Sequence, residues 1–560
     1  MRLRAKHIWF LAFTAVFAVL AGFVFWGTWS TDFAPVMPDC PTAYPVHWFR
    51  SAVVGWLESG KFAPAEAINW IGSPYLWTEF QYVFAAYMAA LGLVYFLRGR
   101  GLSRFASYSA ALLLAFCGYW FTLFSAGHLG WFQWMTYGVF VFGLVDRALT
   151  KGKVRHWLLL GACLAWGSMH QPDLWLLFTV FSAVYFVFRL VVVLRSSEAA
   201  ARRSLGLRWA KGSGLALAAL LAIGLASFRS AFVNDLAGRD KQIDEGQTVG
   251  GNVTDEAEKR WIFVTNWSMP PEAVKEFVCA GVEGDTSCPY TLAIGRKNRN
   301  GIRPYTGRLG RPLGAASGNY RQHSLYVGWV TIVFALVAFV GVLLPFAFPG
   351  FFRLANPQTP KHPNTQTPFI AIYRPDILFF AVAAVVFFLF SLGRFCEPVY
   401  RLVYALPFGD YLRAPVKWHH LTEFALAVLA GFGLDVFVTV MKGRFLGEKG
   451  WRVAEGVLVA LGVVLLVGNA RLYCAPHRTA YELQFADGRI LEDARGVAQI
   501  QQLGAKVAGT YGNAALLEVP RKKTEEPPPE LPDPQPLTLS LGILSLLGTL
   551  AVSAYGIRKS

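Results

Sequence analysis

Long stretches without charged residues are the feature that most constrains how this chain can fold. Leu, Val, Ala and Phe run together over lengths close to the ~20 residues that a helix needs to cross a bilayer. Hydrophobic residues make up 54% of the sequence and charged residues only 16%. This profile is typical of a polytopic membrane protein rather than a soluble enzyme. We therefore expect a mainly α-helical membrane bundle.

The apolar stretches predict 12 transmembrane helices, of which the fourth and fifth look short. The first follows MRLRAKH and is too long for the apolar core of a signal peptide. TWSTDFAP offers no convincing cleavage site after it, so we expect it to be retained. The predicted spans are 8–28, 78–97, 105–123, 131–146, 157–168, 174–194, 212–230, 324–348, 376–393, 420–441, 453–468 and 537–556.

Lys and Arg are concentrated in alternate connections between these spans. With the N-terminus in the cytoplasm, the inside segments hold 24 of them and the short outside loops hold 6. This asymmetry predicts a multi-pass membrane protein with both termini in the cytoplasm. It also accounts for the net charge of +17, so the charge gives no reason to expect a nucleic-acid partner.

Three large regions are then predicted outside the membrane, at 29–77, 231–323 and 470–536. The first two belong with the transmembrane part, 1–469. In the third, alternating apolar strands flank an amphipathic helix, which predicts a small α/β module. RKKTEEPPPELPDPQP follows it as a semi-extended tether, and 537–560 supplies the last transmembrane helix.

The seven cysteines form no zinc-type motif. Cys279 and Cys288 in CAGVEGDTSC could close a short disulfide loop on the oxidising side of the membrane, the alternative being two unpaired thiols. No spacing of residues demands a metal ion, so the sequence does not identify a definite cofactor. Carboxylates at the outer face could still bind Mg²⁺ or Mn²⁺ through oxygen ligands.

The interiors of the predicted helices are almost free of ionisable residues, with Glu423 and Asp435 as the main exceptions. Transporters usually keep such residues near the bilayer midplane, so this pattern favours a reaction at the outer leaflet. The polar residues at the predicted outer mouths include Asp32, Asp39, His47, Arg50, Glu79, His128, His170, Arg413 and Lys417.

Each of these residues has an ordinary structural explanation. A carboxylate in a proline-rich loop is more often a turn former or a helix cap than a catalytic base. A histidine beside tryptophans usually belongs to the interfacial belt, and basic residues there can hold lipid headgroups. As a group, however, they suit sugar transfer from a lipid phosphate. A carboxylate can deprotonate the acceptor, and Arg and Lys can stabilise the departing phosphate.

The order of these features resembles a known family, the GT-C-fold membrane glycosyltransferases, and within it the YfhO-type bacterial membrane proteins. The resemblance covers most of the predicted membrane part and excludes 231–320 and the C-terminal module. Its matching stretches are TDFAPVMPD, FRSAVVGWLESGKFAPAEAINWIGSPYLWTEFQ, AFCGYWFTLFSAGHLGWFQWMTYGVFVFGLVDRAL, SLYVGWVTIVFAL and LGRFCEPVYRLVYALPFGDYLRAPVKWHHLTEFALAVLAGFGLDV.

The resemblance implies a location in a bacterial cytoplasmic membrane and a polyprenyl-phosphate-linked sugar donor. It also implies an envelope glycan, lipid or protein as acceptor, and inverting transfer assisted by an acid of the first outside loop. That acid would be Asp32 or Asp39, which are seven residues apart where many such enzymes have an adjacent acidic pair. Both stay candidates, with Asp32 ranked first because it is nearer the helix end. By position, His128 falls in the family's Gly-His stretch and Arg413 in its Arg-x-Pro stretch.

Two other functions remain open from the sequence. A transporter or flippase for a lipid-linked glycan would also suit 12 helices and would depend on Glu423. A non-catalytic scaffold of an envelope-assembly complex would use the outside regions to bind partners. The leading hypothesis is the glycosyltransferase, with the remaining polar residues of the outer mouths binding substrate or its phosphate.

Overall fold

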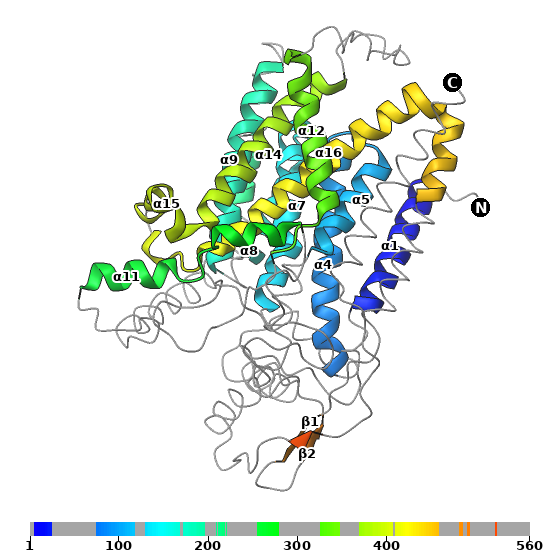
Figure 1. Cartoon of the computed structure of the whole chain (residues 1–560). Coiled ribbons are helices and arrows are strands. Elements are labelled where there is room, and N and C mark those ends of the chain that lie inside the picture. Colours follow the sequence, from blue (N-terminus) through cyan, green and yellow to red (C-terminus); the bar gives the residue numbers. More distant parts are fainter. Residues whose placement is uncertain are drawn as a thin grey trace.

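A computed structural model of the 560-residue chain shows a mainly helical protein (Figure 1). The described parts of the chain are 5–24, 74–117, 129–167, 172–196, parts of 206–220, 255–278, 325–347, 369–406, 409–458, 481–484, 490–492 and 521–522.

The longer helices follow the predicted apolar stretches closely. They are α1 (Ala5–Val24), α4 (Pro74–Gly99), α5 (Arg104–Ala115), α7 (Leu129–Lys151), α8 (Val154–Gly167), α9 (Pro172–Ser196), α12 (Trp329–Ala347), α14 (Phe369–Ser391) and α16 (His419–Val440). The shorter ones are α11 (Glu256–Thr265), η2 (Pro271–Phe277), η4 (Gly393–Cys396), α15 (Glu397–Tyr404), η5 (Gly409–Tyr411) and η6 (Pro415–Trp418).

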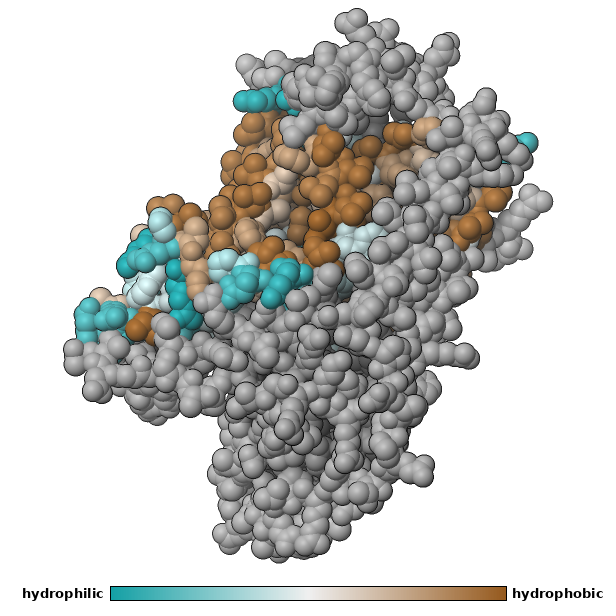
Figure 2. Space-filling model, in the orientation of Figure 1, coloured by the Kyte–Doolittle hydropathy of each residue, from teal (hydrophilic) through white to brown (hydrophobic). Residues whose placement is uncertain are grey.

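Within the described residues, four segments are helical, long and apolar enough to cross a membrane. They are Tyr82–Gly99, Leu174–Arg195, Tyr373–Ser391 and Pro415–Val440. Valines of α9 and α14, such as Val187, Val382 and Val385, are more than half exposed. Figure 2 shows the resulting hydrophobic surface over this side of the bundle, with hydrophilic atoms above and below it. An apolar surface of this kind marks a membrane-associated protein.

The helix α16 lies at the centre of the bundle. In the span that contains it, 78% of the residues are buried, against 33% in the span of α9. The Phe424 ring lies 4.6 Å from that of Phe142 on α7. On another side α12 approaches so closely that a Cβ on Gly433 would collide with the carbonyl oxygen of Phe334. Glycine at this position is therefore what allows the two helices to pack together.

Two predicted helix boundaries differ from the structure. The fourth helix is not short, because α7 continues past Asp146 and Arg147 to Lys151. The charged segment 442–452, predicted as a connection, is also helical: η7 (Met441–Leu446) is π-helical and the helix runs on to residue 458. Gly447, with φ of 62°, separates the two parts. The predicted helices were ended at the first charged side chains. A helix can nevertheless contain charged residues where they form ion pairs or lie near the end of the helix.

The C-terminal region is described only at three short strands. β1 (Tyr481–Gln484) pairs antiparallel with β2 (Ile490–Glu492) and with β3 (Arg521–Lys522). The first agrees with a predicted strand. Ile490–Glu492 differs, because it begins the stretch predicted as an amphipathic helix, and Arg521–Lys522 belongs to the predicted tether. The remainder of the α/β module and the last span, 537–556, lie outside the described residues.

Both ends of the bundle gather polar residues. At one end, which we call the Arg100 end, α4, α7 and α9 finish and α14 begins. At the other, the His420 end, α14 finishes at Ser391 and α16 begins. Here the residues Trp267, Met269, Ala273, Phe277, Leu325, Val327, Ala414 and Val416 form a small core of their own.

Candidate functional site

Most of the predicted site residues lie outside the described residues. These are Asp32, Asp39, His47, Arg50, His128 and His170, together with both disulfide candidates, Cys279 and Cys288. Glu79 lies on α4, but its side chain is also outside the described part. The structure therefore places two of the predicted residues, Arg413 and Lys417, and both belong to the His420 end.

The segment that carries Arg413 and Lys417 is held to a neighbouring one by its backbone. The amide of Ala414 donates to the carbonyl of Val264, and that of Val416 donates to the carbonyl of Trp267, both at 3.1 Å. Trp267 and Ala414 have positive φ values, 57° and 65°. Non-glycine residues rarely adopt this region, and it is found where the surrounding structure imposes it, often at functional sites.

The guanidinium of Arg413 lies over two aromatic rings. Its central carbon is 4.5 Å from the ring centre of Phe263 and 4.4 Å from that of Trp267. Cation–π contacts of this kind fix the orientation of a guanidinium group. The arginine of the Arg-x-Pro motif is therefore a cation held in a fixed orientation.

Lys417 of η6 belongs to a buried group of polar side chains that continues into the start of α16. Its side chain is 8% exposed, and Glu423 two turns later is 2% exposed. His419 and His420 lie between them and are fully buried. Nε2 of His419 is 3.6 Å from one oxygen of Glu423, and Nδ1 of His420 is 3.7 Å from the other. Helical spacings of three and four residues place all three side chains together.

Other elements complete this group. The side chain of Cys117, just after α5, lies beside the Glu423 carboxyl group. Nε2 of His419 is 3.3 Å from the carbonyl oxygen of Leu325, and its ring lies 4.6 Å from that of Phe277. We call Lys417, His419, His420 and Glu423 the His–Glu cluster. It combines one cationic side chain with groups that accept and release protons.

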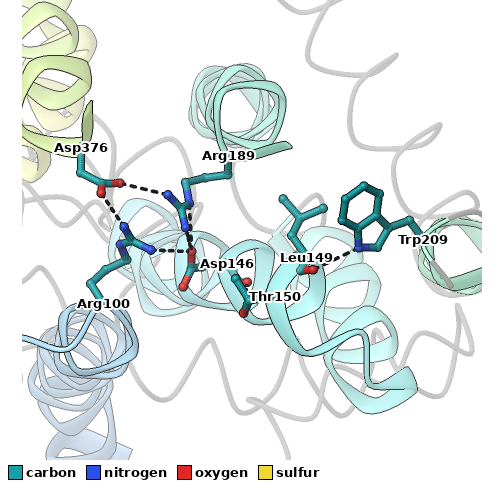
Figure 3. A network of polar contacts seen from close by, with 7 residues as sticks. All are labelled: Arg100, Asp146, Leu149, Thr150, Arg189, Trp209 and Asp376. Atoms are coloured by element: carbon teal, nitrogen blue, oxygen red, sulfur yellow. Dashed lines mark hydrogen bonds and ion pairs between the residues drawn. The ribbon is translucent and has the colours of Figure 1, made fainter. Parts of the chain in front are cut away.

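A second cluster lies at the Arg100 end and was not predicted. Figure 3 shows Arg100, Asp146, Arg189 and Asp376 pointing toward one another from four parts of the bundle. Arg100 contacts Asp146 at 3.1 Å and Asp376 at 2.5 Å. Arg189 contacts the same two carboxylates at 2.8 and 3.6 Å. We call these four residues the Arg–Asp cluster.

Charge is balanced within the Arg–Asp cluster. Burial opposes the charge on Arg100, which lies just beyond α4, but the carboxylates of Asp376 and Asp146 outweigh it and raise its pKa. The two arginines and two aspartates together are formally neutral, as buried ions in proteins require. The prediction that helix interiors are almost free of ionisable residues is therefore wrong for Arg189, which lies inside the predicted span 174–194. Asp376 is the first residue of the predicted span 376–393, but it lies inside α14 because that helix begins at Phe369.

Asp435, the second intramembrane acid noted in the sequence, has a structural partner. Its Oδ1 accepts a hydrogen bond of 2.7 Å from the amide of Ser103, at the start of α5. The hydroxyl of Ser103 in turn caps that helix by accepting from the amide of Ala106. Asp435 therefore ties α16 to the first turn of α5.

Metal binding stays a prediction for the outer carboxylates. In the parts of the chain that the structure describes, no group of three or more His, Cys, Asp or Glu side chains is arranged to hold a metal ion. Asp32 and Asp39, the acids for which Mg²⁺ or Mn²⁺ was considered, lie outside those parts.

Comparison with known proteins adds no relative. No family model matches the chain, no curated protein matches it, and no solved structure matches it.

Proposed function

We propose that the protein is a membrane glycosyltransferase of the GT-C type, similar to YfhO-type proteins. It would transfer a sugar from a polyprenyl-phosphate-linked donor to an envelope acceptor at the His420 end. The observation that carries the proposal is the placement of Arg413 and Lys417. Both are cationic, both are held in a backbone-paired segment, and both lie where the apolar bundle ends.

In this reaction the bond between the anomeric carbon and the phosphate oxygen breaks, and the acceptor hydroxyl oxygen bonds to that carbon. Asp32 or Asp39 takes the proton of the hydroxyl as general base. The lipid phosphate leaves with the electron pair, and Arg413 and Lys417 stabilise its charge. The remaining predicted residues of the outer mouths, His47, Arg50, Glu79, His128 and His170, would bind the substrate.

The proposed topology places this chemistry outside the cytoplasm. Twelve spans with both termini inside put the Arg100 end at the cytoplasmic face and the His420 end at the outer face of a bacterial inner membrane. The exposed apolar surface of the bundle would accommodate the prenyl chain of the donor.

The test measures release of undecaprenyl phosphate from radiolabelled undecaprenyl-phosphate-linked hexoses by the full chain in proteoliposomes with envelope extract as acceptor. We expect Lys417→Met or Arg413→Gln to lower the rate by about 100-fold. The double variant Asp32→Asn, Asp39→Asn should abolish it, while Lys259→Met, which changes an exposed lysine of α11 paired with Glu256, should keep it. Full transfer in the Asp32 and Asp39 single and double variants would overturn the proposal.

The same membranes separate this function from transport. If Glu423→Gln stops movement of a labelled lipid-linked glycan while no glycoside is formed by the unaltered protein, the chain is a transporter. A co-purifying envelope protein whose loss reproduces deletion of this chain, again without any glycoside formed, would indicate a scaffold.

A further inference from the structure

The short helix α15 and the preceding η4 leave apolar side chains exposed at the His420 end. Leu402 is 68% exposed and Leu406, just past the helix, is 56% exposed; Phe395 of η4 is also exposed. The interval of four residues places Leu402 and Leu406 along one side of α15 and its C-terminal end, while Phe395 precedes the helix in η4. Pro398, another exposed residue, falls on the same stripe.

The opposite side of α15 is fixed to the protein. Tyr400 and Val403 are buried, and the Tyr400 hydroxyl donates to the carbonyl of Leu412 at 3.1 Å. Tyr404 packs edge-on against Trp261 of α11 with ring centres 5.3 Å apart. The exposed stripe is therefore held in one orientation rather than carried on a free segment.

The position of α15 connects this stripe to the lipid-facing surface of the bundle. It follows α14 through η4, and α14 exposes Val382 and Val385. Figure 1 shows α15 projecting from the side of the bundle. In Figure 2 hydrophobic atoms border the same projection on the side of the apolar surface, and hydrophilic atoms lie beyond them.

Charged groups lie beside the stripe. Glu397 and Arg401 pair at 2.8 Å, and the Arg401 guanidinium lies 4.1 Å above the Trp261 ring. An amphipathic helix with an arginine and a tryptophan next to its apolar side matches the boundary between headgroups and acyl chains. A protein partner would not require the stripe to continue the lipid-facing surface, whereas a bilayer does.

We propose that η4 and α15 form an interfacial anchor, in which Phe395, Leu402 and Leu406 insert into the lipid leaflet at the His420 end. The anchor would hold the adjoining segment 409–418, and with it Arg413 and Lys417, at the depth of the lipid headgroups. It depends on the membrane bundle and not on the identity of the reaction.

The experiment places the photoreactive amino acid p-benzoylphenylalanine at single positions of the full chain. The protein is reconstituted in nanodiscs of phosphatidylethanolamine and phosphatidylglycerol, irradiated, and analysed by mass spectrometry for lipid adducts. Leu402 and Leu406 are the test positions. Glu397 on α15 and Glu256 on α11 are the matched controls, because both are exposed and polar.

We expect lipid adducts at positions 402 and 406 to exceed those at 397 and 256 several-fold. Equal yields at test and control positions would overturn the proposal. So would a cross-linked dimer, which would show that a second copy covers the stripe, or a cross-link to another protein in native membranes with no lipid adduct. Circular dichroism of each variant confirms that the helices are retained.

Discussion

The two ends of the bundle bury ionisable residues in opposite ways. The Arg–Asp cluster draws its four residues from four parts of the chain, and each of its charges has at least one partner within 3.1 Å. The His–Glu cluster lies within one short stretch, 417–423, at η6 and the start of α16. Its histidine-to-carboxylate distances of 3.6 and 3.7 Å exceed those of hydrogen bonds. Complete pairing suits a structural role, whereas loosely paired titratable groups suit a site that exchanges protons or binds charge.

The largest effect should come from breaking the Arg–Asp cluster. Asp376→Asn removes a charge that Arg100 and Arg189 share, and leaves a net positive charge among buried groups. We expect a loss of about 3–5 kcal/mol in the free energy of unfolding, measured as a shift of the denaturation midpoint in detergent. The double variant Asp376→Leu, Arg189→Met should recover much of this loss. An unchanged midpoint in Asp376→Asn would show that the cluster does not hold the bundle together.

A smaller effect is expected at Asp435, which belongs to α16 but acts as a helix cap. Asp435→Ala leaves the Ser103 amide without its acceptor and should cost about 1–2 kcal/mol. Asp435→Asn keeps an acceptor oxygen and should cost less. Equal losses in the two variants would mean that the charge of Asp435, rather than its hydrogen bond, is what matters.

The His–Glu cluster should tolerate loss of its carboxylate. Histidines can become neutral when their partner does, unlike arginines, so Glu423→Gln should change the unfolding free energy by less than about 1 kcal/mol. The same denaturation series checks this. A loss as large as that of Asp376→Asn would mean that both ends of the bundle depend on fixed ion pairs.

The smallest effect serves as the reference for the other three. Glu397 and Arg401 form an ion pair on the surface of α15, with both side chains about half exposed. Glu397→Gln should change stability by no more than about 0.5 kcal/mol. A larger loss would indicate that this pair is shielded from water.

Hydropathy located the helices well because burial in lipid requires the same apolar composition that the sequence displays. It could not locate the Arg–Asp cluster, since one Arg or Asp hardly changes the average of an apolar stretch. Its pairing also joins residues as far apart as Arg100 and Asp376, 276 positions along the chain. For the site, the sequence singled out Arg413 and Lys417. It did not reveal that Trp267 and Phe263 would hold Arg413, because that contact depends on the fold.

The long interval between the members of the Arg–Asp cluster also bears on how the protein is made. During synthesis Arg100, Asp146 and Arg189 are made well before Asp376, so the incomplete bundle holds two guanidinium groups and a single carboxylate. Arrival of α14 balances them. A chain interrupted before that helix would expose an uncompensated arginine, a feature by which membrane quality control could distinguish an unfinished bundle from a complete one.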